Sequence, residues 1–387
     1  MGDLLSLRQV NGFVLHKQHL AAPTHSASIV ETVEGVGGLH ATGATVPHLS
    51  LRARRKAFTK EELHHALYEQ RSLAKVLCMR NTLFVLPTDL LPVAYQATKK
   101  RRKALLVRYL RHHGITDDEY ERACARVADL LLAGPRTTAE IKQQLSDASM
   151  GVMVDLMPDD WRLVRASPRG TWRSNLHQYA PLESWFPDVQ LDSLSQRDAQ
   201  AELVRHYLSA FGPATEQDVA WWAGLALKEV RQALELLGDS VVKSKVEGVE
   251  GTFLLPAHDL DRLERWDRAA RSELILLPGL DPYIMGYKER SRFLHPCKYG
   301  KVFDRAGNAL PTVLHDGRVI GVWIEDSKRR ALRVLLFDRV DKALVNQLQD
   351  EGEKLSRFLE HDTPDIQIEL YPEDVYPKTP FTLGRKG

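Results

Sequence analysis

The alternation of apolar and polar positions predicts three units in which helices are followed by short strands. In residues 201–256, an amphipathic helix stops at a Gly-Pro pair, a capping box at Thr215 opens a second helix, and 228–237 predicts a third. Two strands, 241–246 and 252–255, flank glycines as in a hairpin. This order of elements is typical of a winged helix.

Two further stretches show the same pattern less completely. Residues 123–145 predict two helices separated by Gly134-Pro135, with a wing at 161–172. Near the front, a capping box at Thr59 opens a helix, and 74–87 predicts the strands that follow. Winged helices usually place a helix in a DNA groove, so the three units predict a duplex-binding face. Protein-interaction and scaffold domains share this order of elements, and that alternative stays open.

After residue 270 the pattern becomes rich in strands. The apolar run 274–277 predicts a short buried strand, and Asp316-Gly317 between apolar segments predicts a two-residue hairpin turn. Residues 331–337 predict another strand and 340–359 an amphipathic helix. We therefore expect an α+β fold, with tandem winged-helix (helix-turn-helix) domains followed by a β-rich C-terminal domain, divided at 1–120, 121–195, 196–270 and 271–387.

Charge decides where a nucleic acid could bind. The 387 residues are 43% hydrophobic, as in ordinary globular proteins, and the net charge is only +2. A DNA-binding face must therefore come from uneven distribution, and a solvated surface explains any basic run taken alone. Beside the predicted winged helices, the basic runs favour double-stranded DNA as partner, bound in a salt-dependent way. The candidate contacts are Arg52, Arg54, Arg55 and neighbouring Lys56; Lys99, Lys100, Arg101, Arg102, Lys103 and, farther along, Arg108, Arg111 and His113; and Lys328, Arg329 and Arg330.

Other classes of function find little support in the sequence. The cysteines are 3 in number and widely spaced, without the pairing typical of zinc sites or disulfide frameworks. The start carries Asp3 and Arg8 in place of a signal peptide's apolar run, and no segment has the apolar length of a membrane span. No glycine-rich nucleotide fingerprint is present. We expect a cytoplasmic protein with no cofactor, metal or membrane partner, and a monomer, because one chain supplies all three units.

Several smaller features allow two interpretations. His112-His113 could reach a phosphate, although an exposed pair at a helix end explains them as well. We expect Tyr283 and Tyr287 to pack in a buried joint, and Trp221-Trp222 to fill a core. Arg329 and Arg330 lie at a predicted hairpin tip, where contact with DNA and plain solvation are both open.

Phrases spread over most of the chain resemble the AlkZ/YcaQ group of DNA glycosylases, and they occur in that family's order. They are GLHAT at 38–42 with PHLSLRAR at 47–54, MRNTLFVLP at 79–87, YAPLE at 179–183, and LPGLDPY at 277–283 with GYKER at 286–290. The resemblance implies tandem winged helices capped by a β-rich domain. It also implies removal of alkylated purines from DNA, including N7-linked lesions and some interstrand crosslinks.

The family's catalytic signature is a polar-hydrophobic-polar triplet, typically Gln-hydrophobic-Gln or Gln-hydrophobic-Asp. This sequence has His40-Ala41-Thr42 at that position. In an extended triplet, His40 and Thr42 would point to one side and could hold a water between them, with a neutral imidazole accepting its proton. The structural alternative is that His40 packs beneath the glycine-rich stretch and Thr42 caps the next segment. A binding protein of the same fold without excision activity is the second hypothesis for function.

Overall fold

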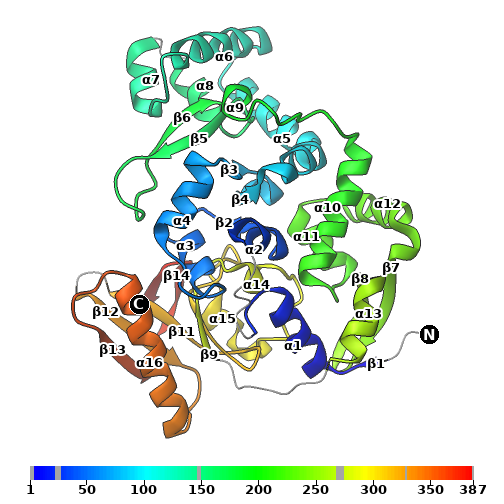
Figure 1. Ribbon diagram of the computed structural model, residues 1–387, viewed down its shortest axis with the longest axis vertical. Coiled ribbons are helices and arrows are strands. Elements are labelled where there is room, and N and C mark those ends of the chain that lie inside the picture. Colours follow the sequence, from blue (N-terminus) through cyan, green and yellow to red (C-terminus); the bar gives the residue numbers. More distant parts are fainter. Residues whose placement is uncertain (1–3, 22–27, 146–149, 267–273, 327–328, 386–387) are drawn as a thin grey trace.

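The protein is a mixed α+β structure with several small sheets (Figure 1). The computed structural model describes residues 4–21, 28–145, 150–266, 274–326 and 329–385. No helix in these ranges is long and apolar enough to cross a membrane.

The first third of the chain builds a three-stranded sheet covered by helices, with strand order β2-β4-β3. Capping boxes at Ser28 and Thr59 start two of these helices, and the one at Thr59 confirms the prediction from the sequence. The elements are β1 (Leu4–Leu5), α1 (Leu7–Lys17), α2 (Ile29–Gly35), β2 (Leu39–His40), α3 (Val46–Arg52), α4 (Lys60–His64), the π-helical η1 (His65–Glu69), β3 (Leu73–Leu77), the 3₁₀ turn η2 (Met79–Asn81), β4 (Leu83–Pro87) and the turn η3 (Thr88–Leu90).

The second third begins with the long basic helix α5 (Leu91–His112) and a group of helices at one end of the molecule (Figure 1). The expected wing at 161–172 is only partly correct. Its first strand is present, but the partner strand lies at 177–181, beyond the predicted range. The elements are α6 (Asp117–Leu131), α7 (Thr138–Leu145), α8 (Met150–Leu156), β5 (Leu163–Pro168), β6 (His177–Pro181) and α9 (Leu182–Trp185).

The clearest predicted unit has its elements in the expected order, with the Thr215 capping box in place. These are α10 (Gln196–Phe211), α11 (Glu216–Ala223), α12 (Leu227–Leu237), the turn η4 (Gly238–Ser240), β7 (Val241–Val246), β8 (Val249–Pro256) and α13 (Ala257–Glu264). The distant β1 adds to this hairpin in parallel with β7. A tandem arrangement of winged helices remains a prediction.

The last third is built on a five-stranded sheet of order β13-β12-β11-β10-β9, with α16 beside it. The predicted hairpin turn is confirmed, because Asp316 and Gly317 have φ angles of 52° and 76°. The elements are β9 (Leu274–Leu277), α14 (Pro282–Met285), η5 (Pro296–Lys298), α15 (Tyr299–Val302), β10 (Thr312–His315), β11 (Arg318–Asp326), β12 (Ala331–Leu336), α16 (Lys342–Phe358), β13 (Asp365–Leu370), β14 (Val375–Thr379) and β15 (Thr382–Arg385).

One large apolar core joins segments that are distant in sequence. It contains Phe13, Phe84, Tyr207 and Tyr287, which come from the front, middle and end of the chain. Helices α6 to α8 form a separate core around Val127. The buried Tyr287, like Tyr283 beside it, confirms the expectation that this phrase packs in a joint. Residues of the later segments therefore hold the front sheet in place by packing against it.

Candidate nucleic-acid interface and active site

The sheet edge that carries His40 is fixed by two glycines. Gly37 and Gly38 have positive φ angles of 75° and 89°, which side-chain-bearing residues rarely adopt. A Cβ on Gly38 would stand 2.5 Å from the Leu86 side chain. The chain can therefore enter β2 closely packed on β4, where His40 pairs with Phe84.

His40 is buried, neutral and without a hydrogen bond. Its side chain is 3% exposed, and its ring centroid lies 4.4 Å from that of Phe84. Burial, and after it the charge of Arg80, lowers the pKa of His40 to about 3. Within the described part of the chain, neither ring nitrogen forms a hydrogen bond. At neutral pH the imidazole is thus uncharged and keeps one nitrogen lone pair that can accept a hydrogen bond.

Thr42 does not lie as an extended triplet would place it. Strand β2 ends at His40, and Thr42 is exposed in the bend that leads to α3. The two side chains consequently occupy different environments, one in the sheet's packing and one in solvent. A water held by both would have to lie at the boundary between them.

Arg80 is the functional candidate that the sequence analysis missed. It and Asn81 have φ angles of 53° and 60°, so two consecutive residues adopt the left-handed conformation. The guanidinium carbon of Arg80 lies 3.8 Å from the Trp221 ring centroid, and that of Arg290 lies 5.2 Å from it. Trp222, by contrast, fills the core as predicted, being 2% exposed.

The charge of Arg80 has no anionic partner among the residues that the structure describes. Burial, followed by the charges of Arg290 and Arg101, lowers the pKa of Arg80 to about 10, and its Nε is buried without a hydrogen bond. Arg80 lines a cavity of about 300 Å³ together with Asn81, Lys100 and Arg101. One carboxylate, that of Glu229, also lines this cavity and accepts from the backbone amide of Ala226, so cations are in excess there, as suits a phosphate group.

The basic run on α5 divides into exposed and buried members. Arg102 is 8% exposed; its guanidinium packs 4.3 Å from the Tyr95 ring centroid and donates to the Thr98 hydroxyl. Arg102 is therefore a correction, because its side chain stabilises the helix packing and is not free for DNA. Lys99 bonds Asp192 at 3.1 Å. The exposed cations of this helix are Lys100, Arg101, Lys103, Arg108 and Arg111.

The first basic cluster is largely used inside the protein. Arg54 is 0% exposed and forms a two-pronged ion pair with Asp281, at 2.7 and 2.8 Å, so the prediction that it contacts DNA is corrected. Arg55 donates to Glu62 at 3.1 Å, and Arg52 stands 3.9 Å from Glu351. These acidic partners neutralise the cluster locally.

The remaining predicted contacts lie apart from this region. Arg329 is exposed at the tip between β11 and β12, and Arg330 there pairs with Asp362. Lys328 lies outside the described residues. His113 is exposed at the end of α5, with its ring against that of Tyr109. The structure thus brings Arg80 near His40 and Arg101 near Arg80, and it leaves the other clusters elsewhere.

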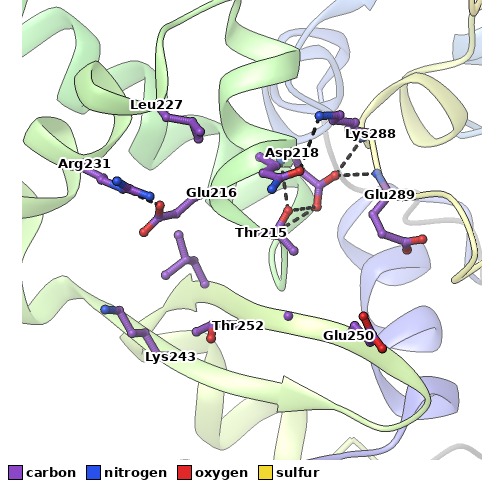
Figure 2. Close-up of a pocket in the computed structure, with 13 residues that line it drawn as sticks. Thr215, Glu216, Asp218, Leu227, Arg231, Lys243, Glu250, Thr252, Lys288 and Glu289 are labelled. Carbon is purple, nitrogen blue, oxygen red and sulfur yellow. Dashed lines mark hydrogen bonds and ion pairs between the residues drawn. The ribbon is translucent and has the colours of Figure 1, made fainter.

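A second cavity, of about 660 Å³, lies between α11, the start of α12 and the β7–β8 hairpin (Figure 2). Glu216 pairs with Arg231 at 2.9 Å across it. The Asp218 carboxylate accepts from the backbone amides of Lys288 and Glu289, both at 2.8 Å. Its charged groups are of both signs and mainly bind each other, so the expected recognition helix does not present a purely cationic face. In the described ranges, no group of three His, Cys, Asp or Glu side chains is placed to hold a metal ion.

Comparison with known proteins identifies the family of this chain. The family model "DNA glycosylase AlkZ-like" matches residues 33–358, and the chain therefore belongs to the AlkZ-like DNA glycosylase family. It is 26% identical over 368 residues to an interstrand DNA cross-link repair glycosylase of Streptomyces sahachiroi. The aligned residues cover 91% of this chain and 96% of that protein. The fold is similar to that of the S. sahachiroi DNA glycosylase AlkZ, with a TM-score of 0.78, 23% identity, and coverage of 95% of this chain and 100% of the other.

Proposed function

We propose that this protein is a monofunctional DNA glycosylase that hydrolyses the N-glycosidic bond of N7-alkylated or otherwise bulky purines in duplex DNA. The observation that carries the proposal is the buried, neutral and unbonded imidazole of His40 beside the unpaired cation Arg80. The relative from S. sahachiroi is named for interstrand cross-link repair, which makes crosslinked purines a further substrate class to test.

The proposed chemistry needs a positioned water more than it needs a proton donor. An N7-alkylated purine is cationic, so the electrons of the broken C1′–N9 bond neutralise its ring and the base departs uncharged. A water oxygen forms the new bond to C1′ while the free nitrogen of His40 accepts a hydrogen bond from that water and orients it, and the proton that the water loses goes to solvent. Thr42 orients that water through its hydroxyl, and the positive charge developing at the sugar favours a neutral rather than a protonated His40.

Arg80 and the exposed cations of α5 have the other role, that of holding phosphates. Arg80 is rigid, since Trp221 lies against one face of its guanidinium and its backbone is confined by Gly224, whose Cβ would stand 3.1 Å from the Arg80 nitrogen. A phosphate at Arg80 and Arg101 would fix the damaged strand near the sheet edge of His40. This placement positions the nucleotide without reading its sequence.

Excision from a defined lesion tests the proposal. Wild-type protein in excess is incubated with a duplex carrying one N7-methylguanine, and hot alkali then cleaves at any abasic site formed. We expect cleavage at the lesion only after alkali. If the protein binds this duplex but releases no base, the non-catalytic binding protein becomes the better hypothesis; if it nicks without alkali, it is not monofunctional.

The cationic face of α5 gives a quantitative prediction. Replacing Lys100, Arg101 and Lys103 together by alanine should weaken duplex binding and reduce the slope of log affinity against log salt by about 2.7, that is about 0.9 for each phosphate that is no longer neutralised. Fluorescence anisotropy at several salt concentrations measures both. The matched control removes Lys298, Lys354 and Arg357, which bond acidic neighbours in the C-terminal region. Equal losses in both triple variants would mean that α5 does not contact the duplex.

A further inference from the structure

A third cavity lies on the face of the front sheet opposite to His40. Cross-strand partners share a face, so Val76 and Phe84 lie on the face of His40, whereas Lys75 and Val85 lie on the opposite one. Lys75 lines a cavity of about 810 Å³ on that opposite face. The walls come from α4, η1, β6 and the segment that links β5 to β6 (Figure 1).

Lys75 is a buried cation without a counter-charge. Its side chain is 6% exposed, and no hydrogen bond or ion pair joins it to any residue in the described ranges. Burial lowers the pKa of Lys75 to about 8, and the charge of Arg165 lowers it further. The neighbouring charge that acts on Lys75 is therefore of its own sign.

His177 contributes a second unpartnered group to the same cavity. It is 9% exposed, and its Nδ1 is buried without a hydrogen bond. Burial, followed by the charges of Lys75 and Arg165, lowers the pKa of His177 to about 3, so the ring is neutral. His48 is similar, with its pKa lowered to about 4, and its Nδ1 lies 3.2 Å from the carbonyl oxygen of Ala44.

Such a group of side chains is unfavourable unless something else occupies the cavity. Burying an ammonium without a partner costs several kcal/mol, and lysines are almost never buried unless they are paired. Here Lys75 and Arg165 raise the local positive potential together, and the two histidines are neutral. An anion in the cavity would supply the missing partner for Lys75 and accept a hydrogen bond from His177.

The other residues that line the cavity indicate which class of molecule would bear the anionic group. Trp172 and Tyr68 offer aromatic surface, and the volume exceeds what a bare inorganic anion fills. Acidic side chains also border the cavity and disfavour a long polyanion such as a DNA strand. They are Glu61, Glu62, Glu69 and Glu360.

We propose that this cavity binds a small organic phosphate, with the phosphate group on Lys75 and His177 and an apolar or aromatic body against Trp172 and Tyr68. The phosphate group would be separate from His40, because Lys75 and His40 lie on opposite faces of the sheet. A phosphate group has several oxygens, so it can accept hydrogen bonds from Lys75 on β3 and His177 on β6 at the same time.

Isothermal titration calorimetry with phenyl phosphate tests the site. We expect wild-type protein to bind phenyl phosphate and to ignore phenol, which has the ring without the charge. Lys75→Met should weaken phenyl phosphate binding by at least about tenfold, as expected for loss of a charged hydrogen bond. Lys298→Met, a lysine at a distant surface, should bind like wild type. His177→Gln should weaken phenyl phosphate binding as well, which tests the second proposed contact separately from Lys75.

Thermal unfolding separates this interpretation from a structural role. Lys75→Met removes an unpaired buried charge, so its melting temperature should equal or exceed that of wild type. A Lys75→Met protein that melts well below wild type would overturn the proposal. So would equal binding of phenyl phosphate by Lys75→Met and wild type, or no binding by wild type at millimolar concentrations. A duplex oligonucleotide that displaces phenyl phosphate would assign the phosphate to DNA and overturn the small-molecule assignment.

Discussion

Replacing His40 by alanine is expected to reduce excision of N7-methylguanine by about a hundredfold, the loss typical of misplacing a reacting group. Single-turnover rates with enzyme in excess measure the chemical step. Duplex affinity should stay within about twofold of wild type, since a 3% exposed side chain that contacts Phe84 has little surface to offer a phosphate.

A conservative replacement makes the His40 test specific. His40→Gln gives the position the residue that the family's triplet typically holds, and an amide oxygen can still accept a hydrogen bond from water. We therefore expect His40→Gln to retain more activity than His40→Ala. The matched control is His258→Ala on α13, where the side chain is 70% exposed. Full activity in His40→Ala would exclude His40 from catalysis.

The rate should also show little dependence on the protonation of His40. Its pKa is lowered to about 3, so the neutral form that accepts a hydrogen bond from water is fully present above about pH 5. An inflection in the excision rate near pH 6.5 that disappears in His40→Gln would contradict this.

Local sequence signals predicted much of the secondary structure. The predicted capping boxes at Thr59 and Thr215 depend only on residues three positions apart, and both are present. The turn at Asp316-Gly317 is equally local, because the positive φ angles it needs favour these residue types. Elements that such signals define can be read from the chain alone.

Contacts between distant segments could not be predicted in the same way. The parallel pairings of β1 with β7 and of β12 with β13 depend on the assembled fold, and no turn signal announces them. The same holds for the stacking of Arg80 on Trp221, 141 positions later in the chain by their residue numbers. The MRN phrase belongs to the family resemblance, but nothing local marks its two left-handed residues.

The basic clusters show how charge alone misleads. Arg102 follows Ala94 and Thr98 at helical spacing along the buried side of α5, so the periodicity held a signal that it faces inward. Arg54 gave no such signal, because its partner Asp281 is 227 residues away. Of the two predicted catalytic residues, His40 lies at a sheet edge, a position that is compatible with an active site. Thr42 is exposed, and the excision experiment is needed to assign it a role.

The pair Arg54–Asp281 leads to the largest expected change in stability. Both side chains are 0% exposed, and Asp281 also accepts from the backbone amide of Tyr283 at 2.9 Å. Asp281→Asn keeps the shape and that amide contact but leaves a buried guanidinium unpaired. We expect it to lower the free energy of unfolding by about 3–5 kcal/mol, measured by urea denaturation.

A double replacement distinguishes loss of the ion pair from loss of packing. In Arg54→Met/Asp281→Leu no charge remains buried, so we expect a smaller loss of stability than in Asp281→Asn alone. The exposed pair of Arg330 with Asp362 provides the control: Asp362→Asn should change stability by less than about 1 kcal/mol. Because Arg54 follows α3 and also donates to the Ser50 carbonyl, breaking its bond to Asp281 should loosen the bend that carries Thr42. If Asp281→Asn unfolds like wild type, the joint between the front sheet and the last third is held by its apolar core alone.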